Sequence, residues 1–221
     1  MNISRFFAIA GALSLLGGCS PRVGHNPNPV AYKPRNPNNV CVKVSLSKQQ
    51  VYVMEGNKPL LVAATCVGTP GTPTPTGTFR AGAKIAKKRS GSYGFYKENG
   101  TVRAAQRGKG PEHAYVGYPM PYWVGLDSKP SYGFHEGYVH PGPRTHGCLR
   151  LHKNVAPKFY ALVKPGTPIH IAHSQPEDLT IGAHVPRPVD YMDPDPHPSI
   201  LLNDASAFPS PPYPLLVDQP L

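Results

Sequence analysis

Residues 133–150 read GFHEGYVHPGPRTHGCLR, and this stretch concentrates the reactive side chains of the sequence. Three histidines, His135, His140 and His146, lie with Cys148 inside fourteen residues. The glycines and prolines between them disfavour a continuous helix and keep the backbone accessible. The pattern predicts an exposed site that combines a thiol with imidazoles.

Cys148 is the candidate nucleophile of this stretch. A free thiol has a pKa of about 8.5 and is only slightly ionised at neutral pH. We expect the nearby histidines and Arg150 to stabilise the thiolate and lower the pKa of Cys148. A thiolate beside an imidazole can attack an amide carbonyl, and Gly147 lets backbone N–H groups approach the developing oxyanion.

The residues before this stretch predict a mainly β domain. Apolar and polar side chains alternate over residues 40–46, as in a half-buried strand. Residues 51–54 continue as strand, residues 55–58 form a turn and residues 60–67 are apolar, so the domain opens with a β-meander.

The middle of the chain is less regular. Turn-forming residues fill 68–77, and a short strand is expected over 78–85. Residues 86–110 are basic and rich in Gly and Ser, which predicts a long solvated loop. Residues 118–124, YPMPYWV, contain the only Trp, and these aromatic side chains either fill the core and a groove wall or contact a substrate.

A short helix is expected after the reactive stretch. Asn154 can cap a helix over residues 155–163, with Pro157 tolerated in its first turn. Pro165 and Gly166 end this helix, and residues 168–172 form a closing strand.

Composition excludes several classes of protein. A chain of 221 residues is long enough for one well-buried domain with flanking segments. Its 29 prolines and 22 glycines exclude a helix bundle or coiled coil. Since the only long apolar run lies at the N-terminus, a membrane protein with many spans is excluded too.

Charge is distributed unevenly along the chain. Residues 20–173 contain 21 Lys and Arg against 5 Asp and Glu, whereas residues 174–221 contain one Arg against 7 acidic residues. A basic body suggests an anionic partner, either nucleic acid or an acidic polymer outside the cytoplasm.

The N-terminus favours the second kind of partner. Arg5 precedes an apolar segment, residues 6–16, which has the length of a secretory core and is too short to span a bilayer. The following residues, LGGC at 16–19, resemble the lipobox of bacterial lipoproteins, in which Cys19 would be acylated and become the first mature residue. Ser20 resembles the second mature residue of lipoproteins sent to the outer membrane. We therefore expect a lipid-anchored periplasmic protein with no nucleic-acid partner.

Four segments follow from these observations. Residues 1–18 are a signal peptide, residues 19–39 a lipidated Pro-rich tether, and residues 40–173 the domain. Residues 174–221, with eleven prolines, form an acidic tail that is extended, draped over the domain or disordered.

The domain resembles a known family. Residues 145–150, THGCLR, are similar to the Ser/Thr-His-Gly-Cys-x-Arg signature of the L,D-transpeptidase catalytic domain family. Residues 42–52 resemble its first strand pair, residues 74–77 its Thr-Pro-x-Gly turn, His135 its upstream histidine and residues 161–171 its closing helix and strand. The resemblance covers roughly residues 40–173 and implies a β-sandwich or barrel-like fold with one or two short helices.

The resemblance also implies a reaction. Cys148 would attack the carbonyl after the L-centre of the third residue of a peptidoglycan stem peptide, a diamino acid, and release the terminal D-Ala. An amine from a neighbouring stem would then resolve the thioester. No cofactor or metal is needed, the anionic substrate suits the basic body, and carbapenem-type inhibitors become possible ligands.

The family motif assigns roles to individual residues. His135 would be the general base and acid, oriented by a backbone carbonyl. His146 and Gly147 would frame the oxyanion site with Cys148, and Arg150 would support the loop or bind a substrate carboxylate. Substrate contacts are expected from four further residues, Thr145, Tyr122, Trp123 and Phe134.

The sequence departs from the family pattern at two points, and alternatives to the assigned base and to the function stay open. The spacing of 13 from His135 to Cys148 is shorter than in many members, and Glu136 replaces the small residue that commonly follows this histidine. His140 is a second choice of base, and His152 is expected at the surface. The chain could instead be a hydrolase or amidase on the same fold, a zinc-binding protein that uses the histidines and Cys148, or a non-catalytic wall-associated lipoprotein.

Cys41 and Cys66 are the remaining cysteines of the domain. An oxidising compartment allows a disulfide between them, and two buried free thiols are the slightly favoured alternative.

Overall fold

Strand β4 (Gly77–Glu98) closes a nine-stranded sheet onto itself in the computed structural model, which describes residues 27–191, 202–210 and 214–220. The other strands are β1 (Val40–Ser45), β2 (Gln50–Glu55), β3 (Lys58–Cys66), β5 (Thr101–Gln106), β6 (Tyr115–Leu126), β7 (Lys129–Glu136), β8 (Leu149–Leu151) and β9 (Pro168–Ala172). Their order is β5-β4-β6-β7-β8-β3-β2-β1-β9, and an added pairing of β4 with β9 completes a ring. The predicted mainly β, barrel-like fold is confirmed.

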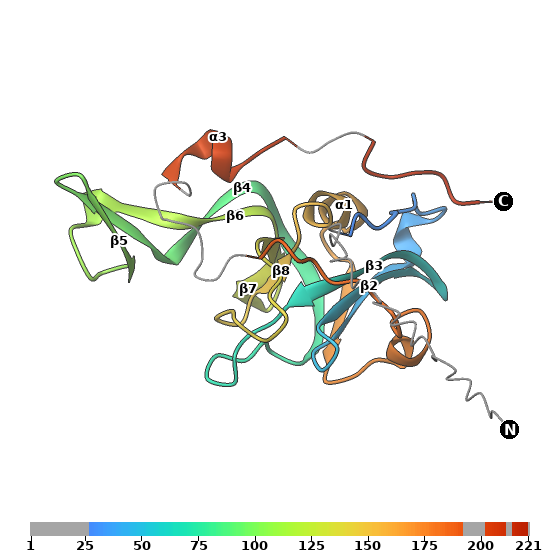
Figure 1. The fold of residues 1–221 in the computed structure, drawn as a ribbon. Coiled ribbons are helices and arrows are strands. Elements are labelled where there is room, and N and C mark those ends of the chain that lie inside the picture. The colour runs from blue at the N-terminus through green and yellow to red at the C-terminus, as the bar shows by residue number, and fades with distance from the viewer. Residues whose placement is uncertain (1–26, 192–201, 211–213, 221) are drawn as a thin grey trace, which may run out of the picture.

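Helical elements are few and short. They are α1 (Ala156–Leu162), α3 (Asp204–Ala207) and the single 3-10 turns η1 (Pro37–Asn39), η2 (Glu112–Ala114) and η3 (Pro176–Leu179). Figure 1 shows α1 against the ring of strands and α3 above the long pair β4 and β6.

The core fills the ring with one face of each strand. Val40, Val42 and Val44 of β1 are buried while Cys41 and Lys43 are half-buried, as their alternation predicts. Phe159 of α1 packs on Phe134 of β7 with ring centroids 4.5 Å apart. Because α1 contributes an apolar side chain directly to this core, its short length does not leave it exposed.

The basic segment 86–110 is not the expected loop. β4 continues to Glu98 and turns into β5, and this pair projects from the barrel as an arm on the left of Figure 1. Most of its side chains are exposed on both faces, so the sequence lacks the apolar alternation that marks a half-buried strand. The strand expected over 78–85 is present as the first part of β4, but it does not end at residue 85.

The predicted cap of the helix was also wrong. Val155 is the N-cap residue of α1 and makes no side-chain cap bond, although a Pro does stand in the first turn as expected. The Asn154 side chain instead donates to the Pro27 carbonyl oxygen, and its backbone N–H donates to Nδ1 of His152. Asn154 therefore fastens the N-terminal segment to the domain.

Cys41 and Cys66 are free thiols in the structure. They lie on β1 and β3, and β2 separates these strands. Strands two positions apart in a sheet lie roughly 9.6 Å apart, beyond the ~7 Å limit for the Cα atoms of a disulfide. The fold therefore favours the free-thiol alternative.

The described parts of the tail are draped over the domain. Asp178 of η3 is buried, and Val217 bridges to Tyr32, whose N–H donates to the Leu60 carbonyl. Arg187 donates to the carbonyl oxygens of Thr65 and His140 at 3.1 and 2.9 Å. These contacts tie the tail to β3 and to the loop before β8.

The predicted signal peptide and Cys19 lie outside the described residues, as does the tether up to residue 26. In the described ranges, no helix is long and apolar enough to cross a membrane.

Replacing Asp178 should destabilise the whole domain. Its carboxylate accepts hydrogen bonds from Tyr52 Oη at 2.7 Å, Ser45 Oγ at 2.8 Å and the Gln175 N–H at 3.0 Å. Asp178→Ala would remove the acceptor that these three donors share, at a cost of about 3 kcal/mol in the free energy of unfolding measured with urea.

Asp218→Ala is the matched control, because Asp218 is 87% exposed and pairs only with Lys33 at the surface. We expect it to change the unfolding free energy by less than about 0.5 kcal/mol. Equal losses in the two variants would show that the Asp178 network does not hold the tail.

Candidate active site

The parallel pair β7 and β8 positions the two reactive side chains. Phe134 lies opposite Leu149 and His135 lies opposite Arg150. Phe134 and Leu149 are fully buried in the core, and successive strand residues point to opposite faces. His135 and Arg150 therefore share the face away from the core, and Cys148, which directly precedes β8, joins them there.

Trp123 of β6 lies beneath the imidazole on the same face. The ring centroids of Trp123 and His135 are 6.3 Å apart at an interplanar angle of 26°. The Lys88 ammonium lies 5.0 Å from the Trp123 ring. Trp123 is only 2% exposed, so it supports His135 and does not offer the surface that a substrate contact requires.

His135 is a buried neutral imidazole. Its Nδ1 lies 2.7 Å from the Glu136 carbonyl oxygen, and because a carbonyl only accepts, Nδ1 carries the hydrogen. Burial, together with the positive charge of Arg150, lowers the pKa of His135 to about 3, although the Glu136 hydrogen bond offsets part of this shift. Nε2 therefore keeps its lone pair at neutral pH and can accept a proton.

Cys148 is a half-buried free thiol, with its Sγ 3.8 Å from the Ser131 carbonyl oxygen. Burial raises the pKa of the Cys148 thiol, and the Gly133 backbone, Arg150 and Lys88 only partly oppose this. The predicted lowering of this pKa was wrong, because loss of hydration outweighs the nearby cations. The resting site thus contains a thiol and a neutral imidazole.

Thr145 holds the loop that presents Cys148. Its hydroxyl donates to the Cys148 carbonyl oxygen at 2.6 Å and accepts the Gly147 N–H at 3.1 Å. Thr145 is 3% exposed, so the predicted substrate contact is replaced by a structural role. The Gly147 N–H is also already committed to this hydroxyl.

Gly147 occupies a position that other residues cannot fill. Its φ is +104°, and a Cβ added there would lie 2.4 Å from Cε1 of Tyr132. Both the backbone conformation and the close packing therefore require glycine.

The turn over residues 68–77 holds the loop that carries Cys148 through hydrogen bonds. The Thr69 N–H donates to the Thr145 carbonyl at 3.0 Å, and the Thr72 hydroxyl donates to the same oxygen at 3.0 Å. The Gly68 N–H donates to the Thr74 hydroxyl at 2.9 Å, which braces the turn itself. The Thr-Pro-Thr-Gly sequence is thus a support for the Cys148 loop.

His146 and Arg150 frame the thiol on two sides. The exposed His146 ring stacks on Tyr93 of β4, with centroids 4.3 Å apart and an interplanar angle of 9°. Arg150 affects the pKa of both His135 and Cys148, so its guanidinium lies near both groups. Its Nη1 is buried and has no hydrogen-bond partner among the residues that the structure describes.

Two predicted substrate contacts lie elsewhere. Phe134 is fully buried in the core against Phe159 and cannot reach a substrate. Tyr122 packs edge-on against Tyr160 of α1 and donates its hydroxyl hydrogen to the Pro209 carbonyl at 3.0 Å. Both residues therefore stabilise the fold beside the site.

The other two histidines are buried away from the thiol. His140 is 3% exposed, and its ring faces Tyr191 at 5.2 Å. His152, expected at the surface, is also 3% exposed, and its Nε2 donates to Asp190 at 3.1 Å. The sequence could not show this pair, because Asp190 lies 38 residues away in a tail without periodicity.

No group of three or more His, Cys, Asp or Glu side chains that could hold a metal ion occurs in residues 27–191, 202–210 and 214–220. The zinc alternative therefore finds no ligand set in this part of the chain.

These observations define a closed β-domain with a cysteine–histidine site on its outer face. The sequence model of the family YkuD, the L,D-transpeptidase catalytic domain, matches residues 39–171. Since this match covers more than half of the chain, the protein belongs to the L,D-transpeptidase catalytic domain family. No curated protein matches the chain significantly.

Solved structures with a similar fold include an L,D-transpeptidase from Stackebrandtia nassauensis, with 19% identity, 66% of this chain and 60% of that chain covered, and a TM-score of 0.46. An L,D-transpeptidase from Mycobacterium smegmatis shows 21% identity, 61% and 58% coverage, and a TM-score of 0.47. The LD transpeptidase LdtMt1 in complex with imipenem shows 18% identity, 61% and 59% coverage, and a TM-score of 0.46. The match thus spans about three fifths of each of these proteins.

Substituting Gly147 should disable the site without unfolding the domain. Gly147→Ala forces the loop to move against Tyr132, and a displacement of about 1 Å at a reacting atom can cost about 100-fold in rate. We expect this loss in the rate at which imipenem modifies Cys148, measured by intact mass.

Gly142→Ala is the control in the same loop, because a Cβ there meets nothing within 4 Å. It should react like the parent. A Gly147→Ala variant that also reacts like the parent would refute the tight fit at this position.

The raised pKa of Cys148 should appear in its alkylation profile. The rate of iodoacetamide labelling follows the thiolate fraction, which is smaller at every pH when the thiol pKa is raised. We expect the rate at Cys148, followed by peptide mass spectrometry, to reach half its maximum above pH ~8.5. A plateau already established near pH 6 would mean a resting thiolate and would contradict the description of the site.

Proposed function

We propose that the protein is a peptidoglycan L,D-transpeptidase in which Cys148 is the nucleophile and His135 is the general base and acid. The observation that supports this most is the proton-accepting Nε2 of a neutral, buried His135 on the same face as a free thiol. Family membership supplies the reaction class, acyl transfer from a tetrapeptide stem with release of D-Ala.

In the first step, Cys148 attacks the carbonyl after the L-centre of the third stem residue. His135 Nε2 takes the Sγ proton as the carbon–sulfur bond forms. Because both groups are neutral at rest, this transfer accompanies the attack and does not precede it. The imidazolium then gives its proton to the departing amine of D-Ala, and the thioester remains on the enzyme.

The backbone of residues 146–148 supplies the oxyanion site in this proposal. The Gly147 N–H is held by the Thr145 hydroxyl, so the N–H groups of His146 and Cys148 are the donors we assign to the oxyanion. Gly147 contributes the backbone conformation that allows them to converge. Arg150 acts through the loop and through its charge beside both reacting side chains.

In the second step, an amine acceptor attacks the thioester. Neutral His135 accepts a proton from this amine and returns it to the departing sulfur, which restores the resting pair. Acceptors consistent with the site are a second stem, an amine of a protein or a D-amino acid. Water in the same position would make the protein a hydrolase.

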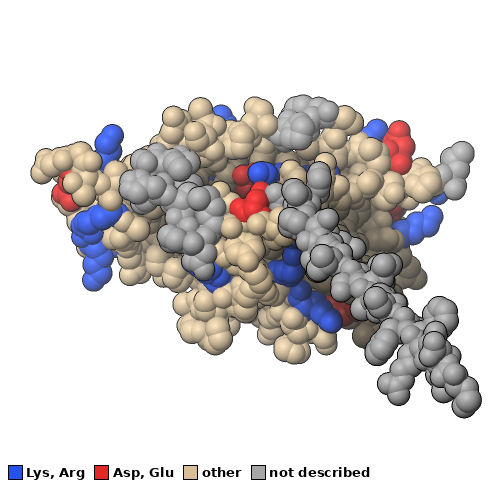
Figure 2. Space-filling model, in the orientation of Figure 1, with Lys and Arg blue, Asp and Glu red and all other residues tan. Residues whose placement is uncertain are grey.

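We infer from the charge and from the N-terminal sequence that this reaction takes place at the cell wall. Lys and Arg side chains gather on the projecting arm in Figure 2, which suits a substrate rich in free carboxylates. The lipobox-like residues 16–19 support lipid attachment through Cys19 and a periplasmic location at the outer membrane.

An adduct with imipenem would test the nucleophile directly. We expect the mature domain to gain the mass of one imipenem at Cys148, and Cys148→Ala to gain none. Cys41→Ala is the control, because Cys41 is a half-buried thiol on β1 and should leave the adduct intact. Equal labelling of the parent and Cys148→Ala would remove Cys148 from the mechanism.

Incubation of the protein with disaccharide-tetrapeptides, followed by analysis of the products, would then identify the reaction. Release of D-Ala with formation of a cross-linked dimer supports the transpeptidase. Release of D-Ala with tripeptide as the only other product would instead identify a hydrolase.

A further inference from the structure

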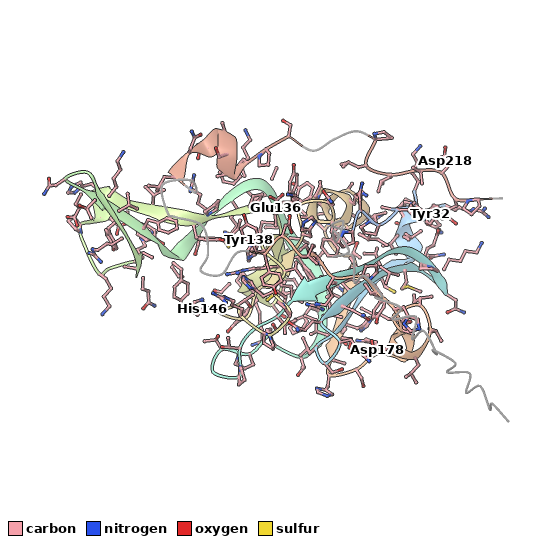
Figure 3. All side chains as sticks on the ribbon, in the orientation of Figure 1. Tyr32, Glu136, Tyr138, His146, Asp178 and Asp218 are labelled. Atoms are coloured by element: carbon pink, nitrogen blue, oxygen red, sulfur yellow. The ribbon has the colours of Figure 1, made fainter. Side chains whose placement is uncertain are left out.

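A cavity with several polar side chains in its lining lies beside the end of β7, close to Glu136. Its volume is about 170 Å³, and its polar lining comes from Tyr118, Glu136, Tyr138, His152, Lys153, Asp190 and Ser206. Glu136 and Tyr138 lie close together near the centre of Figure 3, whereas His146 of the Cys148 loop lies below them. In the same orientation, Figure 2 shows acidic atoms at the surface near the centre of this face.

The charges in this cavity do not balance. Asp190 is paired with Lys153 Nζ at 3.0 Å and with His152 Nε2 at 3.1 Å. Lys153 is thus already matched by Asp190. No hydrogen bond or ion pair joins the Glu136 carboxyl to another residue in the described ranges, so one carboxyl is left without a counter-ion.

The pKa of Glu136 agrees with a carboxyl that has no cation of its own. Burial raises its pKa to about 7, and the field of Lys153 opposes the shift only in part. A carboxyl with its own cation would show the opposite shift.

We propose that this cavity is a subsite for a primary ammonium, and that its ligand is the free side-chain amine of a diamino acid in a wall peptide. This inference rests on the proposed function for the identity of the peptide. A primary ammonium supplies a positive charge beside Glu136 and three donors, and the Glu136 carboxylate is the acceptor that we assign to it in a cavity that Tyr118, Tyr138 and Ser206 also line.

Size and charge favour this ligand. A volume of about 170 Å³ accommodates the aminoalkyl end of one side chain. Residues 20–173 are strongly basic, so a cation is attracted only by the local carboxyls, while the carboxylates of the same peptide suit the surrounding basic surface. One peptide therefore complements both features.

Glu136 also connects the subsite with the base. Its side chain lines the cavity, and its backbone carbonyl accepts the Nδ1–H of His135 at 2.7 Å. Glu136 is therefore a positioning residue for His135, and an amine bound to its carboxylate would hold the strand end that orients the imidazole.

Calorimetric titration of the Cys148→Ala protein would test the subsite without turnover. The probe is a stem tripeptide that ends in a diamino acid and is blocked at its N-terminus, so that the side-chain amine is its only amine. Acetylation of that amine should weaken binding at least about tenfold, because a charge-assisted hydrogen bond is lost. Glu136→Gln should weaken binding of the free-amine peptide equally and remove the difference between the two peptides.

Glu112→Gln is the matched control, since Glu112 is exposed on the projecting arm and pairs with Arg107 there. It should bind like the parent. Between pH 6 and 8 the affinity of the parent should rise as Glu136 ionises beside Lys153, Asp190 and His152, and that of Glu136→Gln should rise less.

Three outcomes would overturn the subsite: no binding of the free-amine peptide, equal binding of the acetylated peptide, or unchanged binding by Glu136→Gln. Each is separate from the fate of the proposed function, which depends on the imipenem adduct at Cys148 in the chain that retains this cysteine. If the protein forms the imipenem adduct but binds the acetylated and free-amine peptides equally, the proposed function stands and the subsite is refuted.

Discussion

The burial of His135 against one backbone carbonyl is the constraint on which the chemistry depends. Its Nδ1–H is donated to Glu136, its ring is removed from water, and the charge of Arg150 disfavours a second proton. Burial and Arg150 lower the pKa of His135 and outweigh the opposing effect of the Glu136 hydrogen bond, which fixes the tautomer, so the imidazole is neutral and presents a single basic atom. The pKa of Cys148 is raised, so in the proposed reaction the neutral thiol gives its proton to this atom as its bond to the substrate forms.

The fold supplies this geometry through the closure of its sheet. A parallel pair such as β7 and β8 needs neighbours on both sides, and β6 and β3 provide them. With Phe134 and Leu149 anchored in the core, the register leaves no freedom in the direction of His135 and Arg150. Twelve residues connect β7 to β8. The turn over residues 68–77 holds this connection by donating hydrogen bonds to the Thr145 carbonyl oxygen.

The alternation of apolar and polar residues predicted the strands that bury one face in the core and expose the other. The alternation over residues 40–46 and the closing strand at 168–172 match β1 and β9 because one face of each meets the core. The arm formed by β4 and β5 was missed because most of its side chains are exposed, and its buried aromatic residues, Phe95 and Tyr96, are adjacent and do not alternate with polar ones. Likewise, the sequence grouped Cys148 with His135, which the structure brings to one face of the sheet, but it gave the wrong sign for the shift of the thiol pKa, since spacing reveals neighbouring charges and not the hydration lost on folding. The pair His152–Asp190 depends on how the tail drapes, which no local pattern encodes.

The protonation and tautomer of His135 provide the most direct test of the whole account. Nitrogen-15 NMR of the folded domain at pH 7 should show a neutral ring, with the hydrogen on Nδ1 and an unprotonated Nε2, and the spectrum should stay unchanged down to about pH 5. A ring that is doubly protonated at pH 7, or that carries its hydrogen on Nε2, would have no unprotonated Nε2 to accept the thiol proton and would contradict the account.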